Sequence, residues 1–237
     1  MANKIESAEK LAQELESCLG DNLRSLLLFG TALRGGFAPA HQDLNVLIIL
    51  DDASTAALRP IQPALSAWAK KRNPVPLIFS EAGWKASTDV FPIEIEDMRE
   101  AHRLIKGDDP FEELTTTRAD LRQELEREVR GKLLQLRAEY ATRAPDGKAL
   151  TMLLIDSAST FFVLMRALVR LDGGEPAKDP AGLVEQASEI ADLDKTAFEW
   201  VIQKISGATV KALKPYDVIG ANYVDAIEEL AAYVDTA

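Results

Sequence analysis

The chain has few of the residues that form covalent cross-links or bind soft metals. Its 237 residues include one cysteine, Cys18, and two histidines, His41 and His102. A single cysteine excludes an internal disulfide and a cysteine-based zinc cluster, and two histidines leave little for a histidine-rich metal site. The sequence is therefore not that of a disulfide-stabilised protein or of a cysteine-ligated zinc protein.

Basic residues are also in deficit. The chain has 27 lysines and arginines against 38 acidic residues, which gives a formal net charge of −11. A protein that neutralises the phosphates of DNA or RNA usually carries the opposite balance, so we expect no nucleic acid as a partner. A small anionic ligand stays compatible with this charge, because a local site can differ from the whole surface.

No targeting or membrane-spanning segment is predicted. The first 20 residues lack the apolar centre of a signal peptide. The most apolar long stretch, residues 150–171, contains Asp156, Arg166 and Arg170, which favours a buried helix over a membrane span. We therefore expect a soluble, cytoplasmic protein with no membrane partner.

The first half of the chain alternates helical and strand-like patterns. Residues 5–18 have apolar side chains at helical spacing, with Cys18 on the apolar face, and Gly20 ends this helix. Three short apolar runs, at 25–29, 46–50 and 75–79, predict strands that are covered on both faces. A helix is expected over residues 54–72, and a fourth strand over 91–96, beginning at Pro92 or lying at a sheet edge. This pattern is typical of an α/β or α+β unit.

The second half reads as helical throughout. After residues 107–110, helical patterns cover 119–141, 150–171, 181–191, 195–206 and 217–234. These five segments predict a helical bundle. We expect two domains, residues 1–112 and residues 113–237.

The stretch between the first two strands carries the chemistry. Gly30 follows the first strand, and a glycine there lets the backbone approach a phosphate closely. A helix start behind it offers unpaired N–H groups, and Thr31 adds a hydroxyl donor. Arg34 is expected to be exposed at the mouth of the site, where it can meet phosphate. These features favour a nucleoside triphosphate as ligand.

A cation site is expected beside this turn. Asp43 and Asn45 are two residues apart at the start of the second strand, so their side chains point to the same face. Oxygen ligands so placed can hold Mg²⁺, which activates an attacking hydroxyl and neutralises the leaving pyrophosphate. A third carboxylate has to come from a neighbouring strand, and Glu94 is the candidate, with Glu96 on the same face as the alternative.

These residues resemble the motif of the nucleotidyltransferase superfamily of the polymerase-beta type. In that family a strand is followed by Gly-Ser, a basic and glycine-containing loop, and then Asp-x-Asp or Asp-x-Glu before the next strand. The resemblance covers roughly residues 5–110, and the helical second half is similar to the bundle of the aminoglycoside-type enzymes. The matching positions are Gly30 and Thr31 for Gly-Ser, Arg34, Gly35 and Gly36 for the loop, and Asp43, Leu44 and Asn45 for the acid pair.

The resemblance implies a fold, a reaction and a set of roles. The fold would be α+β, with a nucleotidyltransferase-like mixed sheet and flanking helices followed by an all-α bundle. The activity would be transfer of a nucleotidyl group, AMP in the first instance, from ATP or another nucleoside triphosphate to the hydroxyl of an unidentified small molecule or protein. The resemblance assigns metal binding (Mg²⁺ or Mn²⁺) to Asp43, Asn45 and Glu94, phosphate binding to Gly30, Thr31, Arg34 and Gly35, and catalysis to Asp43, Glu94 and Asp156.

Two residues, Asn45 and Asp156, leave alternatives open. Asn45 stands where the family has its second acid, and an amide ligates a cation through its carbonyl oxygen without supplying charge. The chain is therefore either an enzyme or a catalytically degenerate relative that acts as a nucleotide-binding or protein-interaction module. Asp156, in the apolar helix, is either a general base toward the acceptor or a buried structural acid, for which Arg166 is a possible partner.

Overall fold

The computed structural model describes residues 2–34 and 44–236. The chain divides into two compact units by its internal contacts. The sheet unit contains the described residues up to Arg34, residues 44–91 and residues Met98–Thr116. The helical unit contains Pro92–Asp97 and residues 117–236. Six residues that precede the expected domain boundary thus belong to the helical unit.

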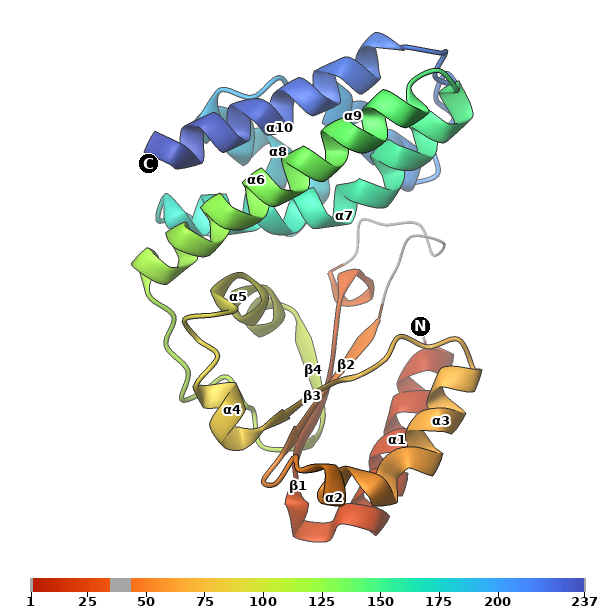
Figure 1. The fold of residues 1–237 in the computed structure, drawn as a ribbon, viewed down its shortest axis with the longest axis vertical. Coiled ribbons are helices and arrows are strands. Elements are labelled where there is room, and N and C mark those ends of the chain that lie inside the picture. Colours follow the sequence, from red (N-terminus) through yellow and green to blue (C-terminus); the bar gives the residue numbers. More distant parts are fainter. Residues whose placement is uncertain (1, 35–43, 237) are drawn as a thin grey trace. The chain divides into compact units, whose positions relative to one another are not determined.

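The sheet unit is built on a mixed sheet of four strands in the order β3-β2-β1-β4 (Figure 1). β1 is antiparallel to both of its neighbours, whereas β2 and β3 are parallel. A mixed sheet followed by helices is the α+β arrangement that the sequence predicts. The strands are β1 (Leu23–Phe29), β2 (Asn45–Leu50), β3 (Leu77–Ser80) and β4 (His102–Gly107).

Both faces of the central strands are covered, as their unbroken apolar runs predict. Leu26 and Leu28 of β1 pack in one apolar cluster with α1 (Ala2–Leu19) and α3 (Gln62–Lys70). Leu27 points to the other face and is fully buried as well. The helix expected over 54–72 is divided into α2 (Thr55–Leu58), a 3-10 turn and α3, because prolines 60 and 63 lack the N–H groups that a continuous helix needs.

The prediction of a strand over residues 91–96 is wrong. Residues Pro92–Glu100 form the helix α5, and the fourth strand is β4, at His102–Gly107. Pro92 is well placed at the first position of a helix, since its missing N–H would be unbonded there in any case. Apolar residues that alternate over six positions fit a strand and also fit the first turns of a helix, so this pattern does not distinguish the two. β4 gave little signal because it is an edge strand with four exposed residues among its six.

α1 ends as expected but presents a different face. Gly20 follows it with φ +53°, a backbone conformation that favours glycine, and so stops the helix. The buried face contains Ala8, Leu11 and Leu15 and continues to Leu19, which packs against the same cluster. Cys18 is therefore exposed, and its prediction as a core residue is wrong.

The helical unit contains the five long helices that the sequence predicts (Figure 1). α7 contacts each of the other four and contributes fourteen buried residues. It begins at Asp146, whose carboxylate accepts hydrogen bonds from the N–H groups of Lys148 and Ala149. The five helices are α6 (Arg118–Arg143), α7 (Gly147–Leu171), α8 (Pro180–Ala191), α9 (Thr196–Ile205) and α10 (Val218–Thr236).

α7 is also, among the described residues, the one helix long and apolar enough to cross a membrane. Length and composition alone are weak evidence for a span, because the central helix of a bundle passes the same test. In this structure 61% of the apolar window of α7 is buried. Its contacts with four neighbouring helices account for its apolar sequence.

We expect Gly107→Ala to destabilise the sheet unit by more than about 3 kcal/mol. Gly107 has φ +82°, and a Cβ there would lie 1.7 Å from the carbonyl oxygen of Arg24 on β1. Urea unfolding followed by the fluorescence of Trp68 and Trp84 measures the loss. In the control Gly131→Ala, on α6, a Cβ meets nothing within 4 Å, and we expect a gain of roughly 0.5–1 kcal/mol. An unchanged urea midpoint for Gly107→Ala would contradict the packing described here.

Candidate functional site

A tight turn ends the central strand β1. Gly30 has φ 120° and ψ 177°, a conformation that is essentially restricted to glycine. Thr31–Leu33 then form one 3-10 turn, in which the N–H of Leu33 bonds to the Gly30 carbonyl at 3.0 Å. Because this turn has three residues, it supplies little of the helix dipole that the sequence led us to expect. What it offers a ligand is backbone without a side chain at Gly30.

Neighbouring strands place two polar residues beside this turn. Phe29, the last residue of β1, pairs with Asn45 on β2 and with His102 on β4. Directly paired residues point to the same face of a sheet, so Asn45 and His102 share one face. The pairing of Phe29 with Asn45 thus places Asn45 next to Gly30. Asp43 and Gly35 lie outside the described residues, and their roles stay predictions.

His102 is held by hydrogen bonds and by ring packing. Its Nε2 lies 3.1 Å from a carboxylate oxygen of Asp109, and its Nδ1 lies 3.1 Å from the carbonyl oxygen of Arg99. Its ring centroid is 4.7 Å from that of Phe111. These contacts hold the ring on three sides.

Arg34 is buried, contrary to the expectation that it is exposed. Its side chain is 5% exposed, and its Nη1 donates a hydrogen bond of 2.7 Å to Oε1 of Glu100. Burial of a guanidinium requires such a carboxylate, because an unpaired charge inside a protein is unfavourable. Glu100 lies 66 positions further along the chain, and no local sequence pattern indicates the pair.

Glu94 lies on α5, in the helical unit, and not on a strand. Its carboxyl group interacts with that of Glu124 on α6. Partial burial raises the pKa of Glu94, and the nearby charges of Glu128 and Asp97 raise it further. The reason for assigning Glu94 to a metal site was a position on a strand beside Asp43, and the helix removes that reason.

Glu124 is the most strongly perturbed carboxyl group among the described acidic residues. It is 5% exposed and accepts a hydrogen bond of 2.9 Å from the backbone N–H of Ile93. Burial, followed by the charge of Glu94, raises the pKa of Glu124 to about 7. Arg127, 3.5 Å away, acts in the opposite direction. Two carboxyl groups in contact favour a shared proton, so the pair holds one proton near neutral pH.

Arg166 is paired, but not with Asp156. Its side chain is 6% exposed, within the apolar helix α7, and both Nε and Nη2 bond to the carboxylate of Asp97 on α5. The bidentate geometry neutralises the guanidinium and satisfies two of its donors. The prediction of Asp156 as a possible partner of Arg166 is therefore wrong.

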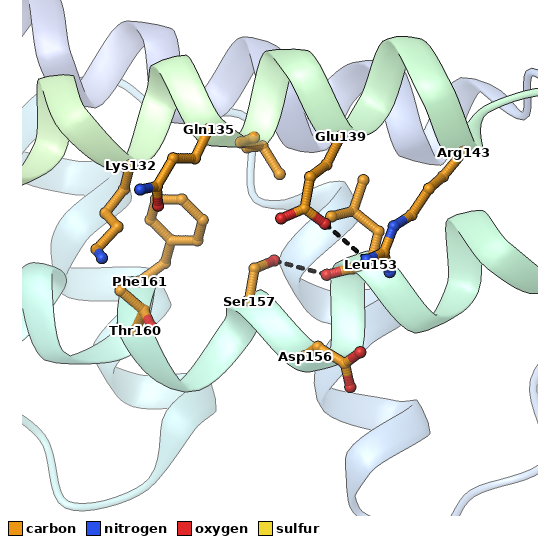
Figure 2. A pocket seen from close by; sticks show the side chains of 10 residues that line it. Lys132, Gln135, Glu139, Arg143, Leu153, Asp156, Ser157, Thr160 and Phe161 are labelled. Atoms are coloured by element: carbon orange, nitrogen blue, oxygen red, sulfur yellow. Dashed lines mark hydrogen bonds and ion pairs between the residues drawn. The ribbon is translucent and has the colours of Figure 1, made fainter.

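Asp156 is exposed, whereas the apolar sequence around it predicts burial. It lies at a pocket of about 260 Å³ between α6 and α7, which Figure 2 shows from close by. Ser157 forms part of the same wall and bonds to the carbonyl of Leu153 and to the hydroxyl of Tyr223. Other polar residues that line the pocket are Lys132, Gln135, Glu139, Arg143 and Thr160.

Comparisons with known proteins agree with this architecture. No family model matches the sequence, and no curated protein sequence matches it. The structure is similar to the crystal structure of spectinomycin adenyltransferase AAD(9) from Enterococcus faecialis with ATP and spectinomycin, with a TM-score of 0.59. The two chains are 14% identical, and the match covers 98% of this chain and 99% of the other. This chain shares the fold of that adenyltransferase.

The nucleotidyltransferase fold confirms the resemblance in architecture, and it leaves the metal site open. Among residues 2–34 and 44–236, no three histidine, cysteine or acidic side chains are placed to hold a metal ion. Of the expected ligands, Asn45 is at the turn, Glu94 interacts with Glu124, and Asp43 is not described. The described residues alone therefore do not assemble the predicted magnesium site.

We expect the helical unit to lose stability as the pH rises through about 7. The pKa of Glu124 is raised in the folded protein above its ordinary value of 4.5, so its contribution is complete below pH 4.5 and is lost above pH 7. Glu124→Gln keeps an acceptor for the Ile93 N–H and cannot ionise. At pH 8.5 this variant should exceed the wild type in unfolding free energy by on the order of 1–2 kcal/mol, and at pH 5 it should not.

Urea unfolding at both pH values, followed by the fluorescence of Trp200 on α9, measures this difference. Glu126→Gln is the control, because Glu126 lies on the same helix in part-exposed ion pairs with Arg122 and Arg130. A pH dependence that is the same in the wild type and in Glu124→Gln would show that Glu124 is ionised throughout.

Proposed function

We propose that this chain is a nucleotidyltransferase that binds a nucleoside triphosphate at the Gly30–Thr31 turn. The observation that carries the proposal is the conformation of Gly30, which ends the central strand of a nucleotidyltransferase fold with bare backbone. The similarity extends over 98% of this chain and 99% of the relative that was crystallised with ATP. ATP is the proposed donor, and AMP is the group transferred.

A divalent cation, Mg²⁺ or Mn²⁺, fits the chemistry of the donor set that we propose. The Asp43 carboxylate and the Asn45 amide oxygen are hard ligands of the kind that these ions prefer. The ion, when bound, supplies positive charge to the triphosphate and to the leaving pyrophosphate. Glu94 is not part of this set, because its carboxyl group is engaged with Glu124.

The proposed acceptor is a hydroxyl group of a small molecule. The structural relative was crystallised with spectinomycin as well as ATP. In this chain the pocket at Asp156 has cations, carboxylates, hydroxyls and an amide in its walls, together with the apolar side chains of Leu136, Leu153 and Phe161. Such a mixture suits a polar molecule with a ring. We propose that the exposed Asp156 carboxylate accepts the proton of the acceptor hydroxyl.

A second candidate function is nucleotide binding without turnover. It is favoured by Asn45, an uncharged residue at the position where the resemblance expects a carboxylate. A site with one carboxylate fewer holds the cation less tightly, so the cation stabilises the transition state less. In this form the chain would act as a nucleotide-binding or protein-interaction module.

We expect metal-dependent binding of ATP that requires Asp43. Calorimetric titration with ATP in Mg²⁺ and in Mn²⁺ should show binding by the wild type and a loss of at least about tenfold in affinity for Asp43→Ala, because a charged ligand of the ion is removed. Asp51→Ala is the control, since Asp51 is an exposed residue at the far end of β2. If none of the four nucleoside triphosphates binds the wild type, the proposed function is wrong.

Asn45→Asp tests which of the two functions holds. The substitution adds the missing negative charge to the proposed site and should raise metal-dependent ATP affinity about tenfold. Pyrophosphate release with spectinomycin-like acceptors measures turnover. Release by the wild type supports the enzyme, and release only by Asn45→Asp supports the non-catalytic module. Loss of ATP affinity in Asn45→Asp would contradict a metal-binding role for this position, and Asp43→Ala in the same background should abolish any gain.

A further inference from the structure

Two acidic residues of α5 each hold an arginine. Asp97 bonds to Arg166 of α7, and Glu100 bonds to Arg34, which follows the Gly30–Thr31 turn. Residues three positions apart in a helix lie on the same side, about one turn from each other. α5 therefore carries both ion pairs on one side. Pro92–Asp97 count with the helical unit and Met98–Glu100 with the sheet unit, so one continuous helix belongs to both.

The first turns of α5 are fixed in the helical unit. Ile93 is 2% exposed and belongs to the main apolar core of that unit, and its N–H bonds to Glu124. Asp97 neutralises Arg166, whose side chain is almost fully buried. A buried charged pair with two hydrogen bonds tolerates little displacement, because leaving either charge alone is strongly unfavourable. This end of α5 is therefore an anchor.

The last residue of α5 reaches the turn. Glu100 Oε1 lies 2.7 Å from Arg34 Nη1, and Arg34 is 5% exposed. The backbone N–H of Arg34 also donates a hydrogen bond of 3.2 Å to the carbonyl of Thr31, within the turn. Arg34 is thus held by its side chain from α5 and by its backbone from the turn. Displacement of Glu100 would move or release Arg34 and with it the end of the turn.

We infer that Glu100 is a positioning residue for the Gly30–Thr31 turn, acting through Arg34. The effect of Glu100 on the turn follows from the geometry alone. An effect of Glu100 on nucleotide binding rests on the proposed function.

Hydrogen exchange at single amides tests the effect on the turn. The N–H groups of Leu33 and Arg34 are the probes, since they bond to the carbonyls of Gly30 and Thr31. In Glu100→Gln we expect their exchange to rise about tenfold, as expected when a bond to a buried charge is weakened. Glu100→Asp keeps the charge and should restore part of the protection. Glu16→Gln is the control, because Glu16 forms an ion pair of 2.7 Å with Lys106 that is about half exposed on both sides.

ATP affinity is measured in parallel, and we expect about a tenfold loss in Glu100→Gln.

The outcomes separate the two proposals. Unchanged exchange at Leu33 and Arg34 in folded Glu100→Gln overturns the positioning role, whatever ATP does. Raised exchange in Glu100→Gln, in a protein that binds no nucleotide, supports the positioning role and contradicts the proposed function.

Discussion

The fold is constrained by one buried guanidinium. Arg166 lies in the apolar helix α7, with a side chain that is 6% exposed, and a charge in that environment has to be neutralised where it stands. Asp97 supplies the carboxylate and accepts two hydrogen bonds. Because Asp97 belongs to α5, this requirement places the first turns of α5, Pro92–Asp97, in the helical unit. The position of Glu124 at the N–H of Ile93 follows from the same docking.

A second ion pair lies at the candidate nucleotide site. α5 ends at Glu100, which holds Arg34, and after Ala101 the chain enters β4 beside β1. β1 in turn ends at Gly30, whose backbone conformation excludes a side chain. The candidate site thus consists of backbone geometry and of charges that other elements hold in place. Such a site needs few particular side chains, which agrees with a shared fold at 14% identity.

The fold was largely predictable because it depends on apolar periodicity. The strands β1, β2 and β3 and the five bundle helices follow patterns within single segments, and such patterns are read without knowledge of partners. The wrong predictions concern segments in which the apolar pattern is short or fits two different structures. Ile93 and Ile95 alternate as in a strand, yet Pro92 begins a helix whose buried residues include both. Cys18 and Leu19 compete for the last buried position of α1, and packing selects Leu19.

Within the candidate site, the sequence alone determined the local features: the glycine after β1, the threonine that follows it, and the placement of Asn45 at the start of the next strand. These depend on neighbouring residues and on the period of a strand. Only the tertiary structure decided which charges meet. It placed Arg34 against Glu100, Arg166 against Asp97 and Glu94 against Glu124, and it left Asp156 exposed at a pocket. Pairs separated by 30 to 69 positions leave no periodic trace, because a charge is satisfied by whichever partner the packing of helices and strands brings to it.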